Sequence, residues 1–333
     1  MSTIVLLPVS VMVVLAGALL FTNAIEWLGA KLELAQGAVG SLLAAVATAL
    51  PESLIPITAI VSGGEGSDDV ALGAILGAPF LLATLAMALV GLSAILWRRR
   101  RPQGVGLNVH FPTLERDLAF FLGCFGAAFL LGVMGAPHWL RIGAAVALVL
   151  AYGGYVRLTL NNCGDPETEA ELPPLLMDRT RGDPPSLGLV IVQCVIALGA
   201  IVGGAELFVE QVIEAAEAVG VEPLLLSLVI APFATELPEK ANSVFWVRDG
   251  KDTLALGNIT GAMVFQSTLP VAVGLAFTDW DFDTPSIVAC SLALAGGLLA
   301  IFELQIRRRF HPRAIVAWAA LFAVFVVYVS AVA

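Results

Sequence analysis

Long apolar stretches separated by short polar connections dominate this chain, and they limit what it can fold into. An α-helix needs about 20 apolar residues to cross the hydrocarbon core of a bilayer, and about ten stretches of that length occur. Apolar residues make up 59% of the 333 residues and charged residues 13%, whereas a soluble domain carries about 25% charged residues. The pattern predicts an all-α polytopic membrane protein.

Counting these stretches gives ten predicted membrane-spanning helices. The first begins next to Met1 with no Lys or Arg before it, unlike a cleaved signal peptide, so we expect a retained helix. The expected bounds are 4–22, 38–62, 69–97, 117–135, 139–159, 187–208, 223–247, 253–277, 284–305 and 314–332.

The basic residues fall almost entirely on one side of this arrangement. Arg98–Arg101 lie in the third connection and Arg307–Arg309 in the ninth, whereas only Arg141 flanks a helix on the other side and Lys240 lies within a span. Cytoplasmic connections carry an excess of Lys and Arg. We therefore predict a multi-pass protein of the cell membrane with odd-numbered connections in the cytoplasm and both termini outside.

A short motif occurs once in each half of the chain. Residues 47–52 read Ala-Thr-Ala-Leu-Pro-Glu, and residues 234–239 read Ala-Thr-Glu-Leu-Pro-Glu. A glycine-bearing segment follows each copy on the next predicted helix, at Ala71–Gly77 and at Ala255–Gly261. Each half therefore holds five predicted helices, with the six-residue motif on the second and the glycine-bearing segment on the third.

Five is an odd number, so two consecutive five-helix units cross the membrane in opposite directions. The sequence predicts a first half over residues 1–160, a cytoplasmic linker over 161–186 and a second half over 187–333. Inverted repeats whose polar, proline-containing helices meet near the midplane are typical of secondary transporters. The linker is too short to hold a further domain.

The motif places a glutamate in the middle of an apolar span in each half. Glu52 and Glu239 lie about fourteen residues into their predicted helices. An ionisable side chain at that depth costs at least a few kcal/mol, and function is the default explanation for it.

Other motif residues supply further oxygen atoms beside each glutamate. The preceding proline has no N–H, so the carbonyls of Ala47 and Ala234 lose their helical donors. Thr48 and Thr235 add hydroxyls one turn before the glutamates. Carboxylate, hydroxyl and carbonyl oxygens within one interrupted turn suit a hard cation such as Ca²⁺, which takes six to eight oxygen ligands.

Two such motifs facing each other would create a site in which ions exchange. At ~6 Å and an effective dielectric constant of ~20, the two carboxylates repel by roughly 3 kcal/mol. The pair is therefore expected to hold a divalent ion, monovalent ions or protons in turn.

These residues resemble the cation/Ca²⁺ exchanger superfamily, specifically the sodium/calcium exchanger type. The likeness covers both repeat regions, roughly 24–91 and 203–276. It implies an inverted five-plus-five fold, alternating access, and a central Ca²⁺ site formed by Glu52 and Glu239 with the motif threonines beside them.

The chain also departs from the family's pattern. The family commonly writes Gly-Thr-Ser-Leu-Pro-Glu, and Ala49 and Glu236 stand at the serine positions here. The second glycine-bearing segment keeps Asn258 and continues to Gln266 without several hydroxyl and amide residues of the family. Oxygen atoms tied to Na⁺ sites are therefore missing, which favours coupling to protons.

Three of these residues have open roles. Asn258 could offer an oxygen ligand or bridge two helices, and Gln266 is a candidate ligand. Glu236 and Lys240 stand in the order that favours a helical ion pair. They could neutralise each other, the ammonium could occupy a cation position, or Glu236 could be an additional ligand or proton carrier.

The function that this pattern favours is a secondary-active antiporter that exchanges Ca²⁺ for Na⁺ or H⁺. A non-transporting scaffold or sensor derived from an exchanger, and an antiporter for a different cation, remain alternatives. We predict no enzymatic activity and no cofactor, because no catalytic Ser/His set or His/Cys metal cluster occurs in the sequence. The expected partners are inorganic cations and the lipid bilayer, without nucleic acid, and the oligomeric state stays open.

Overall fold

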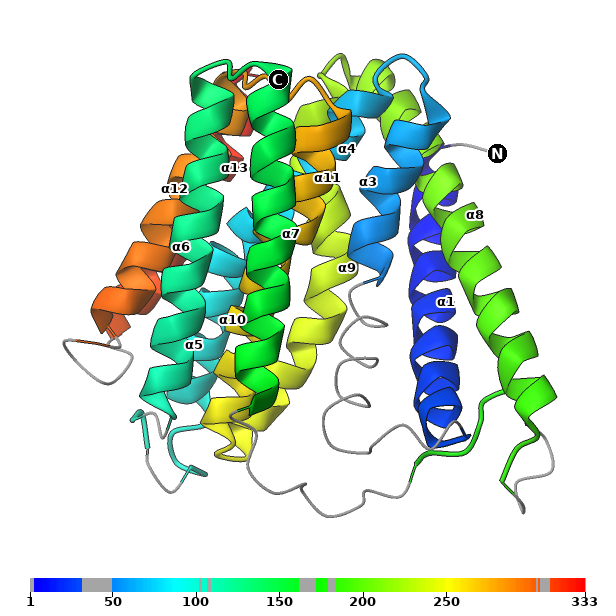
Figure 1. The fold of residues 1–333 in the computed structure, drawn as a ribbon. Helices are drawn as coiled ribbons and strands as arrows, with labels where there is room; N and C mark the ends of the chain where they lie inside the picture. The colour runs from blue at the N-terminus through cyan, green and yellow to red at the C-terminus, as the bar shows by residue number, and fades with distance from the viewer. Residues whose placement is uncertain are drawn as a thin grey trace.

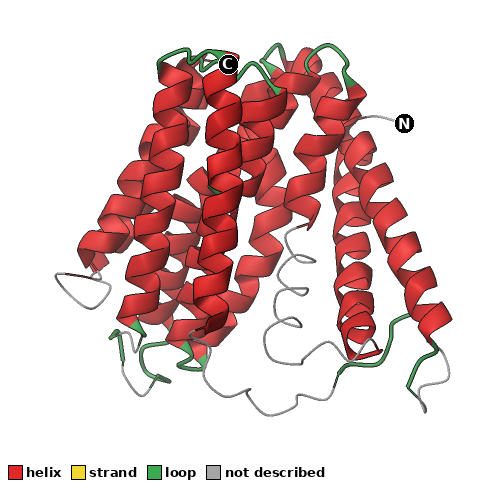
Figure 2. Cartoon of the chain, in the orientation of Figure 1, coloured by secondary structure: helices red, strands yellow, loops and turns green. Residues whose placement is uncertain are grey.

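The computed structural model is a bundle of helices, with no strand among the residues that it describes (Figures 1 and 2). These residues are 3–31, 50–101, 104–106, 109–161, 172–178, 184–303, 305 and 312–332. The helices are α1 (Thr3–Lys31), α3 (Leu50–Ser62), α4 (Ser67–Leu81), the π-helical turn η1 (Leu82–Ala86), α5 (Met87–Leu96), α6 (Phe111–Val133), α7 (His138–Asn161), α8 (Leu187–Val219), α9 (Pro223–Arg248), α10 (Asp252–Gln266), α11 (Leu269–Phe277), α12 (Thr284–Phe302) and α13 (Pro312–Val332).

The helices correspond to the ten predicted crossings. Eight segments within the described ranges are long and apolar enough to cross a membrane, with α4, η1 and α5 forming one and α10 and α11 another. The other two predicted crossings contain α3 and α9, whose apolar segments within the described residues are Glu52–Ser62 and Pro223–Phe233.

Three predicted bounds were wrong because hydropathy locates the apolar part of a helix rather than its hydrogen-bonded length. α1 continues to Lys31 instead of residue 22, and α8 continues to Val219 instead of residue 208. α6 begins at Phe111, six residues before the predicted start. Local signals explain several ends: Ser186 caps α8 through a bond from the Leu189 N–H, and Gly220 ends it at φ 74°.

The two halves are related by an approximate two-fold axis between α1 and α8. Gly17 of α1 lies against Ile201 of α8, and Gly204 of α8 lies against Val14 of α1. The two contacts are equivalent: Gly17 corresponds to Gly204 and Val14 to Ile201 by a shift of 187 positions, the same shift that separates the motif glutamates. A two-fold axis produces reciprocal contacts of this kind.

The remaining packing follows the same symmetry. In the first half the third crossing packs against α12 and α13, whereas in the second half the eighth crossing packs against α6 and α7. Thr84 and Thr268 stand at equivalent positions in these crossings, and each donates its hydroxyl to the carbonyl four residues earlier. Such bonds bend helices, and both crossings are irregular there, at η1 and at the gap between α10 and α11.

The connections also lie at the predicted ends of the bundle. Arg101, after α5, pairs with Asp252 at the start of α10. At the opposite end, Arg141 donates to the carbonyl of Thr278 at 2.7 Å. α1 begins and α13 ends at one end of the bundle, as an even number of crossings requires (Figure 1).

The glycines of the third crossing allow α4 to lie directly against α9. A Cβ on Gly77 would stand 2.3 Å from the carbonyl oxygen of Leu228 and 2.6 Å from Pro232 Cγ. Ser227 of α9 also donates its hydroxyl to the carbonyl of Val70 at 2.7 Å. Gly77 therefore permits the close packing of α4 against α9 in the first half.

Replacing Gly77 with alanine is expected to lower the free energy of unfolding by about 1–3 kcal/mol, because a backbone carbonyl cannot move aside for the new methyl group. Gly123→Ala on α6 is the matched control, since no described atom lies within 4 Å of that Cβ position. Helix propensity alone would stabilise both variants. Thermal unfolding in detergent measures the difference, and equal stability of the two variants would contradict the packing.

Candidate cation site

Glu52 lies on α3 with its side chain inside the bundle. The residue is 8% exposed, and Ile55 and Ala59, about one and two turns later, are also buried. α3 packs against α4 of its own half and against α8 and α9 of the other half. The glutamate is therefore enclosed by helices of both halves, whereas Ala47 and Thr48 lie outside the described residues and stay predicted ligands.

The second copy of the motif lies on α9, which runs as one helix from Pro223 to Arg248. The helix therefore continues through Pro238, and only the backbone N–H that proline lacks is missing there. Thr235 is 5% exposed and donates its hydroxyl to the carbonyl of Ala231 at 3.1 Å. The side chains of Ala234, Glu239 and Lys240 are not among those described, so their roles stay predictions.

Thr235 of the second motif lies close to α3, the helix that carries Glu52. Thr235 and Ile55 of α3 border the same small gap in the packing, together with residues of α1 and α8. The remaining residues around this gap are apolar: Val11, Val14, Leu15 and Phe208. α3 and α9 therefore approach each other beside α1 and α8.

Glu236 and Gln266, two of the candidate ligands, are in direct contact. Glu236 is 1% exposed, and its Oε1 accepts a hydrogen bond of 2.9 Å from Gln266 Nε2, which is also buried. Gln266 is the last residue of α10, at the gap before α11. This bond ties the second motif to the irregular part of the eighth crossing.

Asn258 connects the same two helices nearly two turns after the start of α10. Its Nδ2 donates to Ser243 Oγ of α9 at 3.1 Å, so the amide bridges helices, and its oxygen remains a candidate ligand. Gly257 and Gly261 have no described atom within 4 Å of a Cβ position, unlike their equivalents in the first half. Among the described residues, these two glycines therefore make no close helix contact of the kind seen at Gly77.

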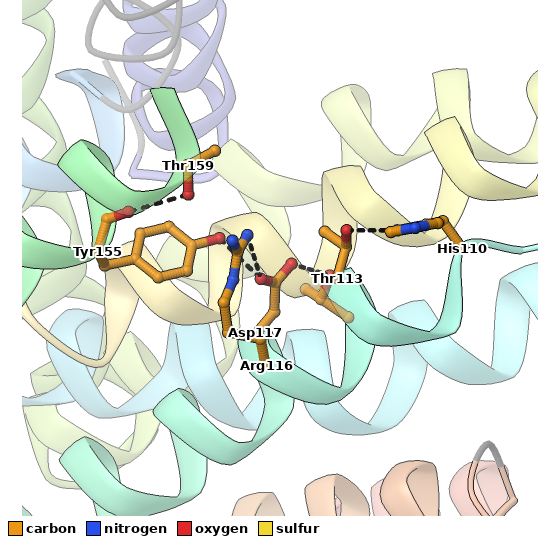
Figure 3. A network of polar contacts seen from close by, with 7 residues as sticks. His110, Thr113, Arg116, Asp117, Tyr155 and Thr159 are labelled. Atoms are coloured by element: carbon orange, nitrogen blue, oxygen red, sulfur yellow. Dashed lines mark hydrogen bonds and ion pairs between the residues drawn. The ribbon is translucent and has the colours of Figure 1, made fainter. Parts of the chain in front are cut away.

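A further buried carboxylate lies on α6, in a network of polar contacts (Figure 3). Asp117 is 2% exposed and accepts hydrogen bonds from Tyr155 of α7 at 2.8 Å and from Thr260 of α10 at 2.9 Å. Arg116 contributes a contact of 3.3 Å, and its guanidinium lies over the Tyr155 ring. Three donors converge on one carboxylate, which holds α10 against α6 and α7.

Three buried charged residues are not among the predicted site residues: Asp117, Arg101 and Asp252. Asp117 coincides with the predicted start of its span, although it lies in the second turn of α6. Arg101 served only to orient the predicted helices, and Asp252 lies one residue before the predicted span 253–277. The available signal is a single charged residue next to or within an apolar stretch in each case, which alone does not identify the partner.

The arrangement offers oxygen atoms as ligands. Glu52 on α3, Thr235 and Glu236 on α9 and Gln266 on α10 are all buried, and they carry carboxylate, hydroxyl and amide oxygens. Within the described part of the chain, no three His, Cys, Asp or Glu side chains are grouped as a metal site. Oxygen ligands suit hard cations and protons rather than softer transition metals.

Comparison with known proteins supports the family resemblance that the sequence motifs indicate. A family model described as sodium/calcium exchanger protein matches residues 2–161 and 189–331. The putative antiporter CaxA of Alkalimonas amylolytica is 26% identical over 280 residues, which cover 81% of this chain and 79% of that protein. The sodium/calcium exchanger MaX1 of Methanosarcina acetivorans is 33% identical over 107 residues, covering 30% of this chain and 31% of MaX1.

Solved structures share the fold along nearly the whole chain. The H⁺/Ca²⁺ exchanger CAX superposes with a TM-score of 0.74 at 23% identity, covering 98% of this chain and 82% of CAX. The sodium–calcium exchanger NCX_Mj superposes with a TM-score of 0.59 at 19% identity, covering 98% of each chain. The matched family model spans both halves, and this chain belongs to the sodium/calcium exchanger protein family.

Proposed function

We propose that this protein is a secondary-active antiporter that exchanges Ca²⁺ for protons by alternating access at one intramembrane site. Family membership supports cation exchange, as do the names of similar proteins, a putative antiporter and an H⁺/Ca²⁺ exchanger. The single observation that carries the site is the burial of Glu52 on α3, in contact with the helix that carries Glu239.

In this proposal Glu52 and Glu239 are the two charged ligands of the transported ion. The approximate two-fold axis between α1 and α8 relates their helices, so the two carboxylates approach from opposite halves. Thr235 and the carbonyl of Ala234 add oxygens from one half, and Thr48 and Ala47 add them from the other. The two carboxylates repel each other when the site is empty, so the empty, fully ionised site is unfavourable. One bound cation is therefore replaced by another.

Protons are the proposed counter-ion because this chain lacks several of the neutral hydroxyl and amide side chains in the family pattern. Glu236 stands where the pattern has a serine, and it is buried against Gln266. A buried carboxylate changes its charge by gaining or losing a proton. Binding several Na⁺ ions would instead require several complete sets of oxygen ligands. This composition favours H⁺ over Na⁺.

Uptake of ⁴⁵Ca²⁺ into proteoliposomes tests the coupling directly. Vesicles with an acidic interior are expected to accumulate Ca²⁺, and a protonophore that collapses the pH gradient should prevent this. Na⁺-loaded vesicles at equal pH on both sides are expected to show no uptake above empty liposomes. Uptake driven by Na⁺ alone would overturn proton coupling, and no uptake under either gradient would favour the non-transporting scaffold.

The cytoplasmic face in this proposal is the end of the bundle that carries Arg98–Arg101 and the start of α10. The basic residues of the other odd-numbered connections support this orientation. Both termini then lie outside the cytoplasm. The linker between the halves, which joins α7 to α8, lies on the cytoplasmic side.

A further inference from the structure

Two buried carboxamides face each other where α1 and α8 lie side by side. Asn23 of α1 is 7% exposed and Gln193 of α8 is fully buried. Gln193 Nε2 donates to Asn23 Oδ1 and to the carbonyl oxygen of Leu20, both at 2.9 Å. Buried amides persist in apolar helices only when their polar atoms are hydrogen-bonded, and the two amides come from opposite halves.

The same amides bind the backbone of the linker between the halves. The N–H of Leu176 donates to Asn23 Oδ1 at 2.9 Å, and the N–H of Met177 donates to Gln193 Oε1 at 2.9 Å. Asn23 Nδ2 in turn donates to the carbonyl of Pro174 at 3.3 Å. The linker backbone thus completes the hydrogen bonding of both side chains.

An apolar anchor and an indole accompany these bonds. Leu175 is 2% exposed and packs in a cluster with Ala24 of α1 and Val190 of α8. Trp27 Nε1 donates to the carbonyl of Pro173 at 2.9 Å. Residues 173–177 therefore contact both helices through backbone and side chain, and they would be exposed if either helix moved away.

We infer that residues 173–177 form a clamp that keeps α1 and α8 together as one unit while the protein transports ions. α1 packs chiefly against α8, and α8 also packs against α3 and α9, the helices that carry the motifs. α1 is therefore placed relative to the site through α8, and Asn23 and Gln193 are positioning residues. The role of the clamp in transport rests on the proposed function.

A reversible covalent link between the clamp residues tests this inference. In a chain whose four cysteines are replaced by alanine, Asn23→Cys and Gln193→Cys together remove the amide network. The reduced variant is expected to transport Ca²⁺ about threefold or more slowly than its cysteine-free parent, with an unchanged Ca²⁺ concentration for half-maximal uptake. A short, reducible bis-thiol cross-linker is expected to restore turnover to within about twofold of the parent.

Restoration by the cross-link is a result that a merely structural role for the amides would not produce. Cross-linked protein that stays slow would overturn the inference, because α1 and α8 would then have to separate during transport. A reduced variant that transports as fast as its parent would also overturn it. Glu52→Gln in the same background separates a failed site from a failed clamp.

A second measurement tests the clamp without transport. Leu175→Asp places a charge in the buried anchor, whereas Leu176→Asp is the matched control because Leu176 is 60% exposed. Tryptic cleavage after Arg179 and Arg181 is expected to be about tenfold faster in the first variant and unchanged in the second. Equal cleavage of both variants would contradict the clamp. A chain without antiport activity would disprove the proposed function and leave this result interpretable.

Discussion

Glu52→Gln and Glu239→Gln are each expected to abolish Ca²⁺ uptake while leaving the protein folded. In the proposed site, each substitution removes one of the two charges that face the ion but keeps the volume of the side chain. Even partners outside the first shell of a metal site contribute about 10–100-fold to affinity or activity, so a direct charged ligand should contribute more. Initial rates of ⁴⁵Ca²⁺ uptake into proteoliposomes measure the loss, with an expected decrease of about 100-fold or more.

The matched control is Glu206→Gln on α8, because Glu206 is also a glutamate in a spanning helix but its side chain is exposed. Its uptake rate is expected to stay within about twofold of the unmodified protein. Size-exclusion profiles and thermal unfolding report whether each variant folds. Normal uptake by either the Glu52 or the Glu239 variant would remove that residue from the site.

Arg101→Met is expected to destabilise the fold by about 3–5 kcal/mol, because it removes one partner of a buried ion pair. Arg101 Nη2 lies 2.8 Å from Asp252 Oδ2, and neither side chain is exposed. Arg101 also donates to the carbonyl of Gly106 at 2.8 Å. The pair joins the connection after α5 to the start of α10, so its loss is expected to loosen the eighth crossing.

Thermal or denaturant unfolding in detergent compares this variant with Arg100→Met. Arg100 is exposed and stacks on Trp97, and its replacement is expected to change stability by less than about 0.5 kcal/mol. The double variant Arg101→Met/Asp252→Leu should regain most of the lost stability, since apolar side chains can replace a buried ion pair. A double variant no more stable than Arg101→Met would show that the pair is not the cause.

Much of the fold follows from patterns that repeat along the chain. The length of each apolar stretch, the position of the arginines and the doubled motif together predict ten crossings in two inverted halves. These signals are local or periodic, so they can be recognised without knowing which residues are in contact in the folded protein. The helix ends were less predictable, because α1 and α8 continue well past the apolar residues that identify them.

The candidate site could be predicted only in outline. The motif identifies Glu52 and Thr235 as residues inside the membrane-spanning bundle, and both are buried, on α3 and α9. The bond between Glu236 and Gln266 depends on where α10 stops relative to α9, which is a property of the packed bundle. No spacing in the sequence contains that information.

The buried polar residues outside the motif show the same limit. Asn23 and Gln193 are 170 positions apart, and each is a lone amide within a largely apolar helix. Their meeting requires the two-fold arrangement of α1 and α8, and the linker backbone then satisfies them. Asp117 likewise finds its donors on α7 and α10, far away in sequence.

Equilibrium binding of ⁴⁵Ca²⁺ to the purified protein tests the central claim, that one ion is shared by acidic side chains from both halves. One Ca²⁺ per chain should bind, and either Glu52→Gln or Glu239→Gln alone should remove all of that binding. Binding that falls only by half in each single variant would mean two separate sites, and the shared site would then be wrong.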